Sequence, residues 1–303
     1  MTLRDLIIVG AGPAGITASV YAARKRMDFL VITKNIGGQA AITADIENYT
    51  GYKFISGPEL VEKFKEHMEQ FDVDIKEDEA VTLVEKRGDV VEVETDRDKY
   101  TARTAIIASG RISRELGAEG EEAFKHRGVT YCATCDAPLF ADVDVAVVGG
   151  GNSGLDAVLQ AVRIASKVHL IEINPELRAD PIMVEQAEKS GKVSIHTSTK
   201  VEKIYGEKFV EGIVVSKSGK TEKIPVKGVF VEIGYVPVSD FVKGVDKNDM
   251  NEIMVNCRCE TNAPGIFAAG DVTDVYGKQI IVACSEGVKA TLAAFDYLSR
   301  SER

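Results

Sequence analysis

The sequence predicts an α/β fold made of two Rossmann-like dinucleotide-binding domains of the three-layer ββα type, with the second inserted into the first. Two observations support this prediction. A glycine fingerprint, Gly-x-Gly-x-x-Gly, occurs at residues 10–15 and again at residues 149–154. Each copy follows a short apolar run and opens a segment of small residues, which is the strand–turn–helix order of a nucleotide-binding βαβ unit.

The two copies also agree in spacing. We expect a strand, a helix and a strand over residues 6–9, 14–24 and 29–32 in the first copy and over residues 144–148, 154–164 and 168–171 in the second. From Gly10 to Thr33 is 23 positions, and from Gly149 to Glu172 is also 23 positions. Two such units about 139 residues apart indicate two similar domains rather than a solenoid.

The remaining segments complete the two domains. The apolar pattern predicts an amphipathic helix over residues 57–70, strands over 81–86, 90–95, 105–108 and 229–234, and a closing helix over 286–298. The C-terminal part fits the first domain best. We therefore expect residues 1–113 and 240–303 to form one domain and residues 114–239 the other, with crossings near 111–115 and 236–242.

Composition limits the classes of function. Hydrophobic residues make up 45% of the 303 positions, charged residues make up 28%, and the net charge is −10. No apolar run approaches the roughly 20 residues that span a bilayer, and no Lys/Arg cluster offers a phosphate-backbone footprint. We expect a cytoplasmic protein without a signal peptide that binds neither membrane nor nucleic acid.

The first fingerprint suits a dinucleotide pyrophosphate. Gly10, Gly12 and Gly15 would let the backbone approach the phosphates at a helix N-terminus. The alternative is tight strand–helix packing without a ligand. The acidic residue that often ends the second strand is replaced by Thr33, followed by Lys34. Ribose recognition at this first site must then come from elsewhere.

The second fingerprint keeps the acidic residue, as Glu172. A carboxylate there accepts hydrogen bonds from the adenosine ribose and repels a 2′-phosphate. Ile173 and Asn174 follow, and Arg178 is the nearest downstream arginine. These residues favour NADH over NADPH. The alternative is that Glu172 is only a solvated strand end.

Cys132 and Cys135 form a Cys-x-x-Cys pair just before the second fingerprint. Three interpretations remain open: a redox-active disulfide, half of a zinc site, or incidental thiols. Asp136 follows directly and could transfer a proton to or from a leaving thiolate, or act as a turn or cap residue. In a reducing compartment such a pair is more often catalytic or metal-binding than structural. The other close pair, Cys257 and Cys259, is over 120 residues away and poorly spaced for zinc, so the redox interpretation is favoured.

The other candidate ligands form no metal pattern, so no metal site is expected. We interpret Cys257 and Cys259, on an expected strand, and Cys284, beside an apolar run, as structural thiols. The four histidines show no metal-ligand spacing and receive no role.

Taken together, these residues resemble the low-molecular-weight thioredoxin reductase family over nearly the whole chain. The resemblance rests on the two fingerprints with Gly37–Gln39, Glu47–Asn48, Cys132–Asp136, Gly270–Asp271 and Gln279. It implies FAD in the domain made of both chain ends, with Asp271 on the ribityl chain and Gln279 by the isoalloxazine. The implied FAD contacts are Gly10, Gly12, Pro13, Ala14, Gly15, Gly38, Gln39, Asn48, Gly110, Gly270, Asp271, Lys278, Gln279 and Ile280.

The inserted domain would hold the nicotinamide nucleotide and the cysteine pair. The implied nucleotide contacts are Gly149, Gly151, Asn152, Ser153, Gly154, Glu172 and Gly234. By resemblance, Cys135 is the thiol nearer the flavin and Cys132 attacks the partner's disulfide. Because nicotinamide and disulfide must both reach the flavin, the resemblance also implies rotation of one domain about the two crossings.

Two sets of residues resemble two different subfamilies. The tetrad Cys132–Cys135 resembles thioredoxin reductase proper, whereas Gly151–Asp156, Glu172, Cys259–Asn262 and Phe295–Leu298 resemble the NADH-dependent flavoprotein component of alkyl hydroperoxide reductase. That component has additional N-terminal thioredoxin-like domains. Because the first fingerprint begins at residue 10, we expect a thioredoxin- or glutaredoxin-like partner to be a separate molecule. The resemblance further implies a homodimer.

The expected activity is therefore that of an FAD-dependent disulfide reductase, which passes electrons from NADH through FAD and a Cys132–Cys135 disulfide to the partner protein. Three alternatives remain. They are a disulfide reductase coupled to ferredoxin or flavodoxin, a peroxide-forming NADH oxidase, and a flavin-bound redox sensor without turnover.

Overall fold

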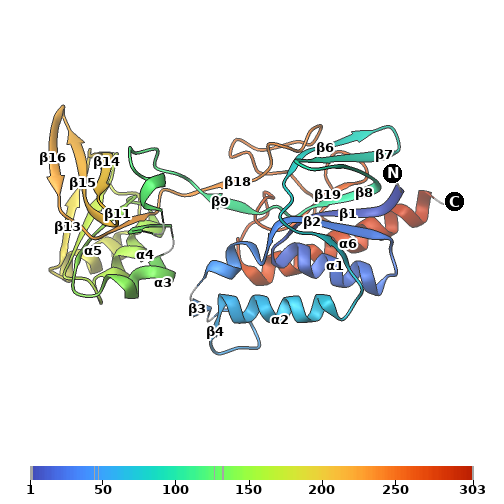
Figure 1. Cartoon of the computed structure of the whole chain (residues 1–303), viewed down its shortest axis with the longest axis horizontal. Coiled ribbons are helices and arrows are strands. Elements are labelled where there is room, and N and C mark those ends of the chain that lie inside the picture. The colour runs from blue at the N-terminus through green and yellow to red at the C-terminus, as the bar shows by residue number, and fades with distance from the viewer. Residues whose placement is uncertain (1–2, 44, 47, 126, 132, 302–303) are drawn as a thin grey trace. The chain divides into compact units, whose positions relative to one another are not determined.

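The computed structural model describes residues 3–43, 45–46, 48–125, 127–131 and 133–301, and only the backbone of Ile42, Asp45, Thr134, Cys135 and Ser301. Two compact units divide the chain: Met1–Ile112 with Val236–Arg303, and Ser113–Tyr235 (Figure 1). The chain thus leaves the first unit after residue 112 and returns at residue 236, whereas the sequence placed the boundaries at 113/114 and 239/240.

The first unit is built on a seven-stranded sheet in the order β5-β2-β1-β8-β7-β6, with β19 also paired to β8. The strands are β1 (Leu3–Ala11), β2 (Phe29–Ile36), β5 (Asp74–Lys76), β6 (Val81–Arg87), β7 (Val90–Thr95), β8 (Lys99–Ile107) and β19 (Ile266–Ala268). Parallel pairing joins β1, β2, β5, β8 and β19, whereas β6, β7 and β8 pair antiparallel. A further short pair is β3 (Asp45–Ile46) with β4 (Ile55–Ser56).

Residues 6–9 of β1 are buried on both faces of the sheet, which explains why they form a continuous apolar run. Leu6 and Ile8 face the core shared with the helices, and Ile7 and Val9 face the core under the antiparallel strands. The helices of this unit are α1 (Pro13–Arg24), α2 (Gly57–Glu69), α6 (Ile280–Ser301) and the 3₁₀ helix η1 (Gly38–Ile42). Figure 1 shows α1, α2 and α6 grouped on one side of the sheet.

The second unit contains a parallel five-stranded sheet in the order β10-β17-β11-β12-β13. Its strands are β10 (Val129–Thr130), β11 (Asp144–Val148), β12 (Lys167–Ile171), β13 (Val193–His196) and β17 (Gly228–Val231). A three-stranded antiparallel sheet forms the next layer, with β14 (Lys200–Gly206), β15 (Val210–Lys217) and β16 (Lys220–Ile224). The helices are η2 (Glu122–Phe124), α3 (Ala133–Asp136), η3 (Ala137–Phe140), α4 (Asn152–Ala161) and α5 (Pro181–Lys189).

The short strands β9 (Arg111–Ser113) and β18 (Tyr235–Pro237) lie at the two crossings of the chain. The predicted fold class, with two Rossmann-like units of parallel strands, is confirmed.

Some elements differ from the sequence prediction. The closing helix α6 begins at Ile280 rather than at residue 286, because the apolar run at its start is part of the helix. The strand expected over 105–108 begins at Lys99, where its first half pairs with β7. The strand expected around Cys257 and Cys259 is wrong: Cys259 has φ +62° and its N–H donates to Asn256 O, so this segment is a turn.

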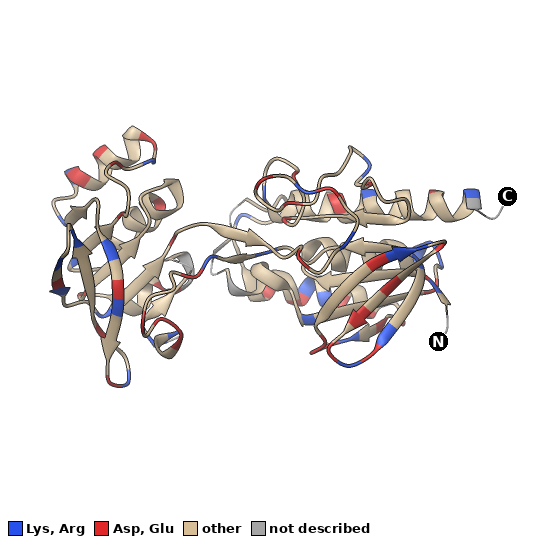
Figure 2. Ribbon diagram, turned by 90° about the horizontal axis from the view of Figure 1, so that it is seen from above, with Lys and Arg blue, Asp and Glu red and all other residues tan. Residues whose placement is uncertain are grey.

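Charges of opposite sign alternate on the surface. Figure 2 shows acidic and basic residues interleaved along exposed strands in both units. Arg87 pairs with Glu92 and Lys99 pairs with Glu94 on the antiparallel strands of the first unit. Within the part of the chain that the structure describes, no helix has both the length and the apolar character needed to cross a membrane.

Candidate functional site

The glycines of the first turn have two different roles. A Cβ added at Gly15 would lie 1.9 Å from Gly10 O, and one at Gly10, where φ is +103°, would lie 2.4 Å from Ala108 O. These two glycines are therefore required by strand–helix packing. A Cβ added at Gly12 would meet nothing within 4 Å. Packing alone thus explains Gly10 and Gly15 but gives no reason for Gly12.

The space beside Gly12 lies at the N-terminus of α1. Gly12 is the N-cap residue, Pro13 is in the first turn, and no side chain caps the helix. The first backbone N–H groups of an uncapped helix, together with the helix dipole, form a favourable site for an anion. The turn therefore fits a dinucleotide pyrophosphate.

Two further predicted segments reach the same turn. A Cβ at Gly38 would lie 3.4 Å from Gly12 Cα, and one at Gly270 would lie 3.1 Å from the Cβ of Ala14. Gln39 follows Gly38 in η1. Segments that are far apart in the sequence thus surround the N-terminus of α1.

Asn48 and Gln279 meet although 231 positions separate them. Asn48 Nδ2 donates to Gln279 Oε1 at 3.0 Å. Ile280, which follows Gln279, is the first residue of α6. Both amides were expected near the flavin, so the structure brings these two predicted residues together.

Two other predicted contacts are engaged in ion pairs. Asp271 Oδ2 lies 2.9 Å from Arg111 Nε, and Lys278 Nζ lies 3.0 Å from Glu252 Oε1. Gly110 has φ +68° in the turn after β8, and a Cβ added there would meet nothing within 4 Å.

Thr33, which stands in place of the usual acidic residue, forms hydrogen bonds with the backbone. Its hydroxyl accepts from Ala11 N–H at 3.2 Å and donates to Asn35 O at 2.6 Å. The side chain is buried. Thr33 thus fixes the end of β2 next to the glycine turn.

The second glycine turn repeats the geometry of the first. A Cβ at Gly154 would lie 1.8 Å from Gly149 O, and one at Gly149, where φ is +123°, would lie 2.2 Å from Glu232 O. A Cβ at Gly151 would again meet nothing within 4 Å, and Gly151 is the uncapped N-cap residue of α4. Gly234, which lies between β17 and β18, has open space and φ +97°.

Glu172 lies over this second turn. Its Oε2 accepts from Gly150 N–H at 2.6 Å and its Oε1 accepts from Asn174 N–H at 2.7 Å. The residue is only 7% exposed, so the alternative of a solvated strand end is wrong. Arg178 is exposed, and its backbone N–H donates to Gly150 O at 2.8 Å.

The polar residues that open α4 have partners in the protein. Asn152 Oδ1 accepts from Asp180 N–H at 2.8 Å, and Ser153 Oγ donates to Glu232 Oε2 at 2.5 Å. Sequence reasoning missed Glu232. The feature that could have identified it is an acidic residue inside the apolar run of residues 229–233.

Of the cysteine pair, Cys132 lies outside the described residues, and Cys135 is described by its backbone in α3. Asp136 ends this short helix, and its carboxylate accepts a hydrogen bond from the Thr130 hydroxyl. Among the described residues, no group of three or more His, Cys, Asp or Glu side chains is arranged for a metal ion.

Cys257, Cys259 and Cys284 are free thiols. Burial raises the pKa of Cys259 to about 12 and also raises the pKa of Cys284. Because the thiolate is the reactive form, both buried thiols are poor nucleophiles. Cys257 is exposed.

Two histidines for which no role was expected lie side by side. His169 Nδ1 and His196 Nε2 are 3.2 Å apart on the paired strands β12 and β13. Burial is the main cause that lowers the pKa of each imidazole.

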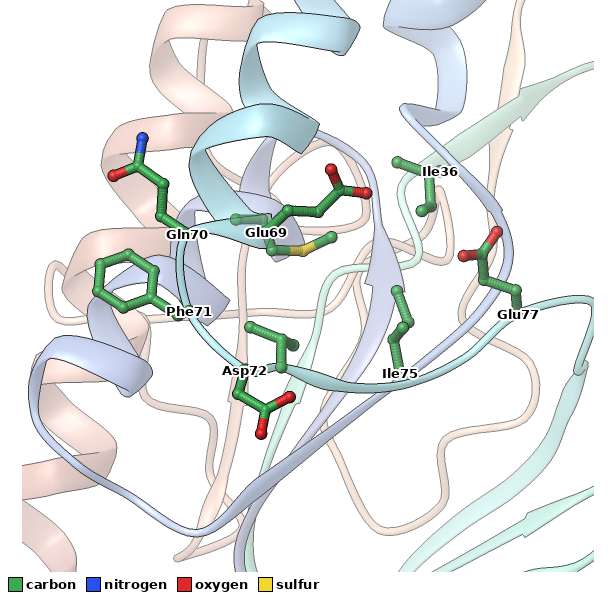
Figure 3. A pocket seen from close by; sticks show the side chains of 9 residues that line it. Ile36, Glu69, Gln70, Phe71, Asp72, Ile75 and Glu77 are labelled. Atoms are coloured by element: carbon green, nitrogen blue, oxygen red, sulfur yellow. The ribbon is translucent and has the colours of Figure 1, made fainter.

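A cavity of about 430 Å³ lies elsewhere in the first unit, where α2 ends and the chain enters β5 (Figure 3). The lining includes Glu69, Asp72 and Glu77. Three carboxylates make this cavity a poor match for an anionic dinucleotide.

Comparison with known proteins supports the same architecture. A family model described as pyridine nucleotide-disulphide oxidoreductase matches residues 4–287. Thioredoxin reductase of Lactococcus lactis shares 35% identity with a TM-score of 0.82, covering 98% of this chain and 99% of that chain. Thioredoxin reductase of T. acidophilum shares 34% identity with a TM-score of 0.79, covering 99% of each.

Curated relatives are longer. A protein from Staphylococcus epidermidis whose name identifies it as one component of alkyl hydroperoxide reductase is 39% identical over 301 residues. A protein named NADH dehydrogenase from Bacillus subtilis is 38% identical over 301 residues. Each alignment covers 98% of this chain and 59% of the relative. The chain therefore spans about three fifths of the length of these relatives.

Proposed function

Because the chain belongs to the pyridine nucleotide-disulphide oxidoreductase family, we propose that it is a flavoprotein disulfide reductase. In this proposal, electrons pass from NADH through FAD and a Cys132–Cys135 disulfide to a separate thioredoxin- or glutaredoxin-like protein. One observation supports it above all: each unit has a glycine turn with open space at its middle glycine, Gly12 or Gly151. The second of these turns lies in the same unit as the cysteine pair.

The turn at Gly12 is the proposed site of the FAD pyrophosphate. Gly10, Gly12, Pro13, Ala14 and Gly15 would hold the phosphates at the N-terminus of α1. The rest of the cofactor would be held by Gly38, Gln39, Asn48, Gly110, Gly270, Asp271, Lys278, Gln279 and Ile280. When bound, FAD would supply the chemistry that joins a two-electron hydride donor to a disulfide.

The turn at Gly151 is the proposed nicotinamide nucleotide site, with Gly149, Asn152, Ser153, Gly154 and Gly234 beside it. Glu172 would accept the ribose hydroxyls and repel a 2′-phosphate, which favours NADH. Three donors already fix its carboxylate over the turn: Oε2 accepts from Gly150 N–H, and Oε1 accepts from both the backbone N–H and the side-chain Nδ2 of Asn174. Each carboxylate oxygen has two lone pairs, so Oε2 keeps acceptor capacity for one ribose hydroxyl.

The cysteine pair is the proposed exchange site. Cys132 would attack the partner's disulfide as a thiolate, and Cys135 would form the internal disulfide with it. Asp136 is the proposed proton-transfer group. Its hydrogen bond from the Thr130 hydroxyl would keep the carboxylate in place next to the pair.

The proposal predicts the behaviour of a cysteine variant. Changing both Cys132 and Cys135 to Ser should lower NADH-dependent reduction of thioredoxin by roughly a hundredfold or more, because the nucleophile is removed. Reduction of bound flavin by NADH should remain. Stopped-flow absorbance and a coupled thioredoxin assay measure the two steps separately.

Cys257→Ser is the matched control, because Cys257 is an exposed free thiol. It should retain both steps. Undiminished thioredoxin reduction in the double variant would contradict the proposal. A peroxide-forming oxidase would behave differently. The wild type would not reduce thioredoxin, and the double variant would consume NADH with oxygen as fast as the wild type.

A further inference from the structure

A buried carboxyl group lies beside the first glycine turn. Glu286, in the second turn of α6, is only 1% exposed, and its Oε2 accepts from Gly270 N–H at 2.7 Å. A Cβ added at Gly270 would lie 3.1 Å from the Cβ of Ala14, in the first turn of α1. Gly287, the residue after Glu286, packs on the same turn, because a Cβ there would lie 2.2 Å from Ala14 O. Glu286 is thus adjacent to two segments that would hold FAD.

The carboxyl group of Glu286 has one firm donor for its two oxygens. Thr273 Oγ1 lies 3.4 Å from Oε2, but this hydroxyl has a single proton and also donates to Gly270 O at 2.8 Å. Oε1 is buried and has no hydrogen-bond partner within the part of the chain that the structure describes. A buried carboxylate needs several donors or a contacting cation to offset its lost hydration, whereas a neutral acid needs fewer. These surroundings therefore suit the protonated form.

The titratable groups around Glu286 do not replace the missing donors. Lys289 of α6 and Lys278, which precedes this helix, act on its charge from a distance, and Lys278 Nζ pairs with Glu252 Oε1 at 3.0 Å. The Cys259 thiol is uncharged at neutral pH, because burial raises its pKa to about 12. The first turn of α1 contributes no acidic residue. Burial is the main cause that raises the pKa of Glu286, and its hydrogen bonds and the two lysines lower it only in part.

The charge of Glu286 would oppose a pyrophosphate at the N-terminus of α1. Two negative groups in neighbouring positions repel each other, and the neutral form of a carboxyl group is then favoured further. Asp271, the residue after Gly270, already has a counter-ion, since its Oδ2 lies 2.9 Å from Arg111 Nε. Protonation of Glu286 removes the repulsion and still leaves an acceptor for Gly270 N–H.

We propose that Glu286 is a positioning residue that holds the Gly270–Asp271 segment as a neutral carboxylic acid, and that FAD binds tightly only when this acid is protonated. The proposal rests on the proposed FAD site of the first unit. When the free protein carries ionised Glu286, FAD binding takes up one proton from solution, and that proton goes to the carboxyl group of Glu286. A rise in pH that ionises Glu286 therefore weakens FAD binding.

The test uses the full-length protein from which flavin has been removed. It is titrated with FAD from about pH 6 to about pH 9, above the ordinary glutamate pKa. Flavin fluorescence gives the affinity, and calorimetry in two buffers of different ionisation enthalpy gives the number of protons taken up. Glu286→Gln keeps an acceptor for Gly270 N–H but cannot ionise. Glu62→Gln is the matched control, because Glu62 is an exposed carboxylate of α2 in the same unit.

At the lowest pH, the wild type and Glu286→Gln should bind FAD equally well. Toward the highest pH, the wild-type affinity should fall at least about tenfold below that of Glu286→Gln, which corresponds to a difference of one pKa unit between the free and bound protein. The wild type should take up as much as about one proton per FAD, and this uptake should be absent in Glu286→Gln. Glu62→Gln should follow the wild type in both measurements.

Two outcomes would overturn the proposal in distinguishable ways. If FAD binds and the wild type shows the same pH dependence and proton uptake as Glu286→Gln, Glu286 does not carry the proton and the FAD site stands. If FAD does not bind the wild type at any pH, the FAD site falls and the coupling with it. Should Glu286→Gln fail to fold, the proton count of the wild type decides, and no uptake over this pH range overturns the proposal.

Discussion

Single glycines in the two fingerprints divide into those that the fold needs and those that a ligand needs. Gly15 approaches Gly10 O too closely for any side chain, whereas Gly12 faces open space. We expect Gly15→Ala to lower the free energy of unfolding by roughly 3 kcal/mol, the upper end of the usual cost of overpacking. Gly12→Ala should leave the stability of the flavin-free protein unchanged but reduce the flavin retained on purification.

Urea unfolding and flavin content per chain measure these two effects. Gly154→Ala and Gly151→Ala repeat the comparison in the second unit, where the same contrast between contact and open space occurs. Equal loss of stability in Gly12→Ala and Gly15→Ala would contradict the division of roles.

Coenzyme preference should depend on Glu172. Glu172→Gln keeps an acceptor for Gly150 N–H but removes the charge that favours ribose hydroxyls and opposes a 2′-phosphate. We expect the ratio of kcat/KM for NADH to that for NADPH to fall roughly tenfold, in line with the loss of a charge-assisted hydrogen bond.

Steady-state kinetics with both coenzymes provide the measurement. Glu176→Gln is the matched control, because Glu176 is an exposed carboxylate four positions along the chain. A variant Glu172→Gln with the wild-type ratio would show that the carboxylate does not select the coenzyme.

Among the elements, the pair β12 and β13 brings two imidazoles together. Burial lowers the pKa of His169 and of His196 in the folded protein. As pH falls through the ordinary histidine value of about 6.5, the unfolded chain binds protons that the folded chain does not. Stability should therefore be lost on going from pH 7.5 to pH 5.5, with a slope of up to about 1.4 kcal/mol per pH unit for each histidine.

Urea unfolding at several pH values tests this dependence. His169→Gln should make the slope smaller, whereas His67→Gln, an exposed residue of α2, should not change it. Identical slopes in the three proteins would rule out the histidine pair as the source.

The sequence predicted the strand, turn and helix of both glycine fingerprints because their signals are local. The apolar runs of β1 and β11 and the glycine turns after them need only neighbouring residues to be recognised. The turn at Cys259 could not be found in this way, because the alternation around it suits a strand and only the φ of +62° distinguishes it. The early start of α6 was missed because its apolar first turn has no visible cap signal.

At the scale of the whole molecule, the sequence could not predict which distant segments come into contact. Asn48 and Gln279 were expected near one cofactor only through a family resemblance, and their hydrogen bond joins residues 231 positions apart. The pairing of His169 with His196 and the link from Glu232 to Ser153 depend on sheet register, which residue patterns do not specify. These contacts follow from the order of the strands, which brings separate strand ends to one edge.

The chain as a whole should pass electrons from NADH to a bound flavin. We would mix the purified, flavin-containing protein with NADH and, separately, with NADPH under anaerobic conditions, and follow flavin absorbance by stopped flow. We expect rapid bleaching by NADH and much slower bleaching by NADPH. No bleaching by either coenzyme would contradict this expectation, because the second glycine turn would then not be a working donor site and a ferredoxin-like donor would be required.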